Sequence, residues 1–84
     1  MYKVFLVDDE IVIREGIRNN FPWEGSDFSL AGEAPDGEIA LQMMQDVKPD
    51  ILITDIRMPF MDGMQLCEAV SHTMPWVQIV ILSG

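Results

Sequence analysis

The sequence lacks several features that define common classes of protein. Its single cysteine, Cys67, excludes an internal disulfide bond, and it has no apolar run of about 18 residues that could span a membrane. The amino terminus, MYKVFLVDD, has neither the long apolar segment nor the small-residue cleavage site of a secretory signal peptide. These absences predict a cytoplasmic protein that makes no contact with a membrane.

Basic residues are also scarce in this chain. Five Lys and Arg residues stand against fourteen Asp and Glu residues, which gives a net charge of −9. Such a charge repels phosphate backbones, so it argues against direct binding of nucleic acid, and it suits a metal ion or a cationic partner better. The 49% hydrophobic content predicts a folded chain, although 84 residues bury only about 60–65% of the unfolded surface.

The first half of the chain predicts two strands separated by a helix. Residues 4–7 (VFLV) form a continuous apolar run, which is typical of a strand covered on both faces of a sheet. Apolar residues then recur every fourth position from residue 13 to residue 21, so this segment is predicted to be an amphipathic helix that ends before Pro22. The alternation over residues 28–34 predicts a strand at or near a sheet edge.

The second half repeats this alternation. Asp36-Gly37 opens a second predicted helix, which Pro49 closes, and residues 51–53 form a third apolar strand that leads into Asp55. A third helix begins at Asp62 with Gln65 as its capping partner, and residues 77–82 form a fourth strand. The side chains expected to be buried on the second and third helices are Ile39, Ala40, Met43, Met44, Val47, Leu66, Cys67 and Val70.

Acidic side chains follow two of these apolar strands. The element order predicts an α/β fold with a doubly wound parallel sheet, in which ligands bind at the carboxyl ends of the strands. Asp8 and Asp9 follow the first strand, Asp55 ends the third, and Ser83 follows the fourth. We therefore expect these side chains to gather at one edge of the sheet.

Three clustered carboxylates repel one another, and a hard cation such as Mg²⁺ is the usual remedy. One carboxylate could then attack phosphorus and form an aspartyl phosphate. The structural alternative is that Asp9 caps the first helix while Asp8 is solvated. The addition of Asp55 at a neighbouring strand end favours the metal site over this alternative.

Three motifs carry a resemblance to a known family. They are LVDDE at residues 6–10, PDILITDIRMP at residues 49–59 and MDG at residues 61–63. Over all 84 residues the chain resembles the receiver domains of two-component response regulators, which have a flavodoxin-like fold. The segments PW at 22–23, GEA at 32–34 and DGEIAL at 36–41 are similar to receivers that precede an AraC-type helix-turn-helix output domain.

The resemblance implies a role for each matching residue. Asp55 matches the phosphoacceptor, Asp8 and Asp9 match the pair that binds Mg²⁺ together with Asp55, and Arg57 matches the position whose backbone carbonyl completes the metal shell. Ser83 matches the switch hydroxyl that hydrogen-bonds the phosphoryl group. The implied partner is a sensor histidine kinase, and the implied output is regulation of transcription. Such a domain is not an enzyme beyond its own phosphorylation and dephosphorylation.

The family pattern has elements that this sequence does not contain. A complete receiver has five strands and five helices, so residues 1–84 are interpreted as a partial receiver domain without the fourth helix, the fifth strand and the fifth helix, and without an output domain. Neither Lys3 nor Lys48 can replace the lysine of the fifth strand, because each lies at or before the amino end of a strand. The edge of residues 77–82 would be unpaired, which predicts self-association, pairing with a separate remainder, or poor solubility.

Two other functions compete with the phosphoacceptor hypothesis. The fold could serve as a non-signalling interaction or assembly module, in which the acidic residues have no role. Binding of Mg²⁺ and a phosphoryl adduct on Asp55 would distinguish the two. An aspartate-nucleophile phosphohydrolase is disfavoured, because such sites usually need a second acid two residues after the nucleophile, where this chain has Arg57.

Overall fold

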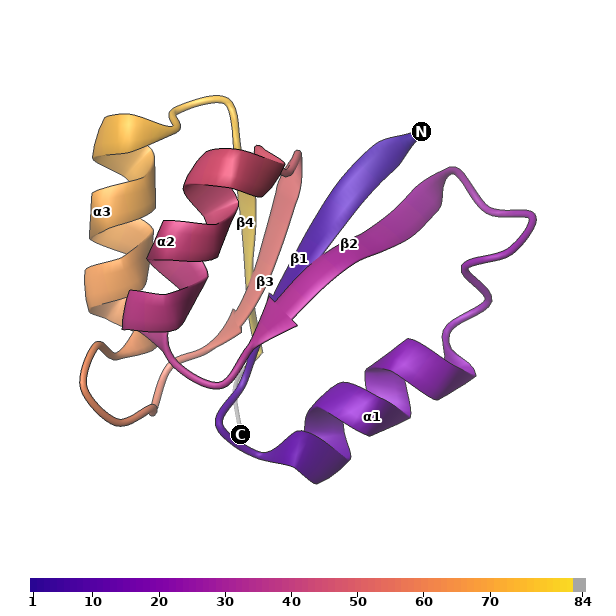
Figure 1. Ribbon diagram of the computed structural model, residues 1–84, viewed down its shortest axis with the longest axis horizontal. Helices are drawn as coiled ribbons and strands as arrows, with labels where there is room; N and C mark the ends of the chain where they lie inside the picture. Colours follow the sequence, from indigo (N-terminus) through magenta and orange to yellow (C-terminus); the bar gives the residue numbers. More distant parts are fainter. Residues whose placement is uncertain (83–84) are drawn as a thin grey trace.

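The computed structural model describes residues 1–82. Strands and helices alternate along this part of the chain (Figure 1). The longest helices have 11 residues, and none in the described part of the chain has the length and apolar character to cross a membrane. The strands are β1 (Tyr2–Val7), β2 (Phe28–Ala34), β3 (Ile51–Asp55) and β4 (Gln78–Leu82), and the helices are α1 (Ile11–Asn20), α2 (Gly37–Val47) and α3 (Gly63–Thr73).

The four strands form one parallel sheet in the order β2-β1-β3-β4. This is the strand order of flavodoxin-like folds, and it confirms the predicted doubly wound architecture. Helices α2 and α3 lie on one face of the sheet, and α1 lies on the other (Figure 1). The order places β1 and β3 side by side in the middle of the sheet, with β2 and β4 at its edges.

The core fills the space between the sheet and helices α2 and α3. Its buried side chains come from β1, β2 and β3, from helices α2 and α3, and from the segment between α3 and β4, and the largest of them are wholly inaccessible to solvent. Ile79 of β4 is partly buried and packs against this cluster. Burial of this apolar surface is the main contribution to stability in a chain of this size. The buried members of the cluster are Phe5, Val7, Ala34, Ala40, Met44, Leu52, Leu66, Val70, Met74 and Val77.

Two helices begin at the aspartates expected from the sequence. Asp36 is the N-cap of α2, and its Oδ1 accepts a hydrogen bond from the backbone N–H of Ile39 at 2.9 Å. Asp62 is the N-cap of α3 and forms a reciprocal capping box with Gln65, through bonds of 2.8 and 3.0 Å. These caps satisfy backbone donors that have no partner within the helix.

The predicted stripe on α2 was wrong in part. Ala40 and Met44 are buried as expected, but Ile39 is 43% exposed and Met43 is 36% exposed. Five apolar positions span more of the helix surface than the sheet and α3 can cover, so the outer two remain in contact with solvent. On α3, Cys67 is only half-buried, although Leu66 and Val70 are buried as predicted.

Ion pairs connect helix α1 to the sheet. None of the side chains of α1 is buried, and Ile13, the first residue of the apolar pattern that predicted this helix, is 40% exposed. Glu33 on β2 accepts hydrogen bonds from Arg14 at 3.2 Å and from Arg18 at 2.8 Å, and these ion pairs tie the helix to the sheet edge. Helix α1 is therefore the least buried of the three helices in the described part of the chain.

A candidate acidic metal and phosphoryl site

The sheet register brings the acidic residues together. Val7 at the end of β1 pairs with Thr54 of β3, so Asp8 and Asp55 are each the next residue along neighbouring parallel strands. Carboxylate oxygens of Asp8, Asp9 and Asp55 all lie within 4.8 Å of one another. Asp8 and Asp55 are 47 positions apart in the chain, and the parallel pairing of β1 with β3 makes them neighbours.

Asp8 is the buried member of the cluster, with 4% of its surface exposed. Burial raises the pKa of its carboxyl, and the charges of Asp55 and Asp9 raise it further. The backbone N–H of Glu10, which donates to Asp8 Oδ1 at 2.9 Å, and the charge of Arg14 act in the opposite direction and lower this pKa. The net upward shift means that ionised Asp8 lacks sufficient compensating positive charge.

Asp55 is half-buried at the end of β3, with one side-chain oxygen already fixed. Its Oδ1 accepts a hydrogen bond from the backbone N–H of Ile56 at 2.7 Å, and its carbonyl oxygen accepts one from the hydroxyl of Thr54 at 2.9 Å. Within residues 1–82, Oδ2 of Asp55 makes no hydrogen bond. The hydrogen bond to Oδ1 thus fixes the orientation of the carboxylate, and Oδ2 remains available to bind a ligand.

The loop after β3 is packed against the start of α3. The backbone N–H of Gly63 donates to the carbonyl oxygen of Ile56 at 2.7 Å, and a Cβ at Gly63 would overlap the carbonyl oxygen of Asp55. Phe60 in this loop has φ of 68°, a left-handed conformation that is uncommon for an aromatic residue. Such backbone strain is often found at functional sites, and here it lies in the loop that follows Asp55.

Arg14 also borders the site, although no motif in the sequence indicated this role. Its guanidinium donates to the carbonyl oxygen of Asp8 at 2.5 Å and is paired with Glu33. The sequence did contain one indication of this role, a basic residue in the first turn of the helix that follows the two aspartates. A long side chain at that position can reach back to the end of β1. Arg14 holds the backbone that carries Asp8 and leaves the three carboxylates without an ion pair among the described residues.

The structure gives a different outcome for each of the other predicted site residues. Asp9 lies in the cluster but does not cap α1, because the N-cap is Glu10 and no side chain caps it. Asp8 is buried and not solvated, so the structural alternative for this pair was wrong. The side chain of Arg57 is exposed. Ser83 lies outside the described residues.

The donor set suits a hard divalent cation. It consists only of oxygen atoms, it carries up to three negative charges, and one of its members is buried with a raised pKa. Mg²⁺ binds through one or two carboxylates, substrate oxygens and retained water, and so these residues fit it. A phosphoryl group brought to the same place would add further oxygen ligands.

Comparison with known proteins agrees with this geometry. Residues 4–84 match the model of the response regulator receiver domain. The chain is 43% identical over all 84 residues to the uncharacterized transcriptional regulatory protein YesN of Bacillus subtilis, and it covers 23% of that protein. It superposes with a TM-score of 0.93 on the REC domain of AraT, a response regulator from Geobacillus stearothermophilus, at 36% identity, covering 99% of this chain and 64% of the other.

A second solved structure gives the same result. A two-component transcriptional regulator AraC from Clostridium phytofermentans superposes with a TM-score of 0.91 at 33% identity, covering all of this chain and 68% of the other. The chain therefore belongs to the response regulator receiver domain family, whose members are signalling modules. Receiver domains generally bind Mg²⁺ in an acidic pocket of the kind formed here by Asp8, Asp9 and Asp55. This chain spans less than a quarter of the length of YesN.

Proposed function

We propose that this chain is a phosphoacceptor receiver domain in which Asp55 accepts a phosphoryl group from the phosphohistidine of a sensor histidine kinase. Mg²⁺ would be held by Asp8, Asp9 and Asp55 and by the backbone carbonyl of Arg57. The observation that carries the proposal is the convergence of three carboxylates within 4.8 Å at the carboxyl ends of β1 and β3. An accidental cluster from three separate positions is improbable at the edge where such sheets bind ligands.

Asp55 is the best candidate nucleophile of the three. Its Oδ1 is fixed by the backbone N–H of Ile56, which leaves Oδ2 to attack phosphorus. A bond then forms between Oδ2 and phosphorus, the bond between phosphorus and the histidine nitrogen breaks, and the imidazole keeps the electron pair. Asp8 is too buried for this role, whereas Asp9 is exposed and unconstrained by any hydrogen bond among residues 1–82.

The surrounding residues hold the nucleophile and its neighbours in place. Arg14 fixes the carbonyl of Asp8 through the bond of 2.5 Å, and Gly63 allows the start of α3 to pack closely against the end of β3. When bound, Mg²⁺ supplies positive charge that offsets the carboxylates and the incoming phosphoryl oxygens. The raised pKa of Asp8 implies that the cation competes with a proton for this carboxylate.

The proposed consequence of phosphorylation is regulatory. A phosphoryl group adds about −1.5 to −2 charge at one point of the surface, by analogy with other phosphorylated side chains. Ser83, outside the described residues, is proposed as the switch hydroxyl from the family pattern alone. We further propose a cytoplasmic location and control of transcription through an output domain, since the net charge of −9 disfavours DNA binding by this segment itself.

The test is phosphorylation of the purified chain by a small phosphodonor such as phosphoramidate, with and without Mg²⁺. Intact-protein mass spectrometry should detect one phosphoryl adduct that requires Mg²⁺ and is lost in Asp55→Asn. The matched control is Asp46→Asn, which neutralises an exposed aspartate on α2 and should leave the adduct unchanged. Absence of an adduct both in this chain and in a version extended with the fourth helix, fifth strand and fifth helix of a relative would overturn the proposal.

A further inference from the structure

Glu33 reaches helix α1 because of an irregularity in strand β2. The register of β2 against β1 shifts by one residue after Leu30, so Ala31 is an extra residue that forms a bulge. Without this bulge Glu33 would pair with Val7 and would share its face of the sheet, which is the core side. With the bulge Glu33 pairs with Leu6 and points to the other face, where α1 lies. The bulge therefore directs this carboxylate toward the helix, a common use of bulges beside functional sites.

On that face the carboxylate of Glu33 accepts hydrogen bonds from two arginines. Its Oε1 accepts from Nε of Arg14 at 3.2 Å, and its Oε2 accepts from Nη1 of Arg18 at 2.8 Å. The side chains of Arg14 and Glu33 are only 11% and 21% exposed, so water screens their attraction less than that of a surface ion pair. Nη1 of Arg14 donates to the carbonyl oxygen of Asp8 at 2.5 Å. The guanidinium of Arg14 thus lies between Glu33 and the main chain that carries the acidic site.

The position of Arg14 matters because the guanidinium borders carboxylates with which it forms no ion pair. Among residues 1–82 its only ion-pair partner is Glu33, and it contacts the main-chain oxygen of Asp8 and not the carboxylate. Arginine forms its strongest hydrogen bonds with carboxylates, often through two parallel bonds. A guanidinium released from Glu33 would therefore be drawn to the acidic cluster, where it would occupy oxygens that a cation needs.

We propose that Glu33 is a positioning residue, which holds Arg14 on the main chain of Asp8 and so keeps its guanidinium off the carboxylates that bind Mg²⁺. This inference rests on the proposed function, since it gives Glu33 a role in the binding of that cation. Glu33 acts through Arg14 and not as a ligand, because it is not one of the three acids whose oxygens lie within 4.8 Å of one another. Residues that orient the ligands of a metal commonly change its affinity without touching it.

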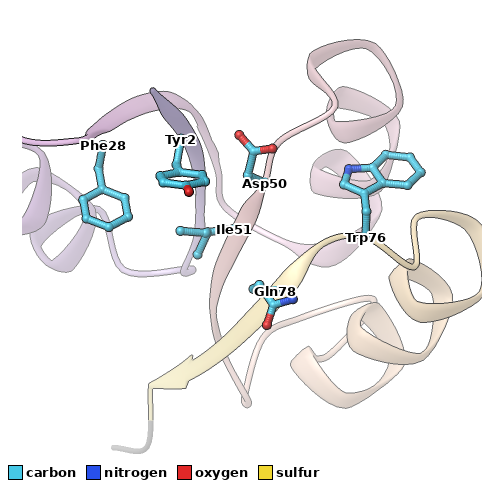
Figure 2. Close-up of a pocket in the computed structure, with 6 residues that line it drawn as sticks. All are labelled: Tyr2, Phe28, Asp50, Ile51, Trp76 and Gln78. Carbon is cyan, nitrogen blue, oxygen red and sulfur yellow. The ribbon is translucent and has the colours of Figure 1, made fainter.

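The first test measures the dissociation constant for Mg²⁺ of the 84-residue chain by titration, followed through the amide NMR signals of Asp9 and Glu10. Glu33→Gln should weaken binding about tenfold, because it frees a guanidinium that competes with the cation. The control is Asp50→Asn. Asp50 is also a half-buried acid, and its Oδ2 accepts from the backbone N–H of Lys3 at 2.8 Å, but it lies beside a hollow at the amino ends of the strands (Figure 2). This control should change the constant by less than about twofold.

The second test distinguishes the loss of position from the loss of charge. In an Arg14→Gln background, Glu33→Gln should change the dissociation constant by less than about twofold, because no guanidinium remains to move. An equal loss of affinity in both backgrounds would mean that Glu33 acts only through its charge, and would overturn the inference. A wild type that binds no Mg²⁺ would contradict the proposed function as well. A wild type that binds Mg²⁺ as tightly as Glu33→Gln would overturn this inference alone.

A third measurement uses the wild type and does not depend on the folding of any variant. The Nε–H proton of Arg14 should exchange slowly with solvent both with and without Mg²⁺, because Oε1 of Glu33 accepts it in both states. The Nε–H of Arg18 makes no hydrogen bond within residues 1–82 and should exchange rapidly, which provides an internal reference. Rapid exchange of the Arg14 proton in the metal-free protein would show that Glu33 does not hold the guanidinium, and would overturn the inference.

Discussion

Replacement of Asp8 by asparagine should stabilise the metal-free protein at neutral pH. The substitution keeps the shape of the side chain and the Oδ1 that accepts from Glu10, but it removes a buried negative charge from a group of three. At 4.8 Å, two unit charges repel by about 0.9 kcal/mol in bulk water and about 3.5 kcal/mol at an effective dielectric constant of 20. The lower repulsion energy applies to Asp8 and Asp9, because Asp9 is exposed to water. The higher energy applies to Asp8 and Asp55, because Asp55 is half-buried.

The net gain must be smaller than the sum of these two repulsions. Arg14 offsets part of the charge on Asp8, and the repulsion between Asp8 and Asp9 persists in the unfolded chain because they are sequence neighbours. We therefore expect Asp8→Asn to raise the free energy of unfolding by about 1–3 kcal/mol at pH 7. For a domain of this size each kcal/mol corresponds to an increase of about 4–8 °C in Tm.

The pH dependence of this effect follows from the direction of the pKa shift. Because burial and the neighbouring carboxylates raise the pKa of Asp8 in the folded protein, the folded state binds the proton more tightly than the unfolded state. Ionised Asp8 thus costs stability above its folded pKa, and protonation relieves this cost. The advantage of Asp8→Asn should shrink as the pH falls through the folded pKa and vanish below the ordinary value of 3.8.

The assay is thermal and urea unfolding of the two proteins, monitored by circular dichroism with and without Mg²⁺. A cation at 100 times its dissociation constant stabilises the wild type by about 2.7 kcal/mol, so Mg²⁺ should narrow or reverse the difference between the proteins. Glu68→Gln removes one charge from an exposed position on α3 and serves as the control. The reasoning is refuted if Asp8→Asn lowers Tm at pH 7 without Mg²⁺, or if Mg²⁺ stabilises both proteins equally.

Three further substitutions test the scaffold of the site, each by urea unfolding. Gly63→Ala should cost about 3 kcal/mol or more, because its Cβ would overlap the carbonyl oxygen of Asp55; an unchanged midpoint would mean that α3 can move away freely. Asp62→Ala should cost about 1 kcal/mol through loss of the cap on α3, and an unaltered stability would contradict the capping box. Met44→Ala should cost about 2–5 kcal/mol and Met43→Ala much less, because only Met44 is wholly buried.

The clustering of the acids was predictable because it depends on topology. Apolar runs that end in acidic residues define strand ends, and parallel strands place those ends at one edge whatever the details of packing. Asp8, Asp9 and Asp55 could therefore be grouped from the sequence. The capping box at Asp62 could also be predicted, because it is a local pattern of two polar residues three positions apart.

Features that depend on the packing partner could not be derived in the same way. The apolar residues of α2 define a broad stripe, but the position of α3 decides that Met44 is buried and Met43 is not. Likewise, the sequence places Arg14 on the polar side of α1, whereas its contact with the carbonyl of Asp8 depends on how the helix crosses the strand end. The periodicity of side chains along a helix shows which residues share one face, but it does not show which element packs against that face.

The properties that suit this chain to bind a cation also limit its stability. Three carboxylates within 4.8 Å oppose folding, and the opposing charge is greatest on Asp8, where burial prevents solvent from relieving it. A chain of 84 residues has a small core with which to offset this repulsion. Occupancy of the acidic site should therefore be coupled to folding, so that Mg²⁺ raises the stability of the whole sheet and not only the order of the loop around Asp55.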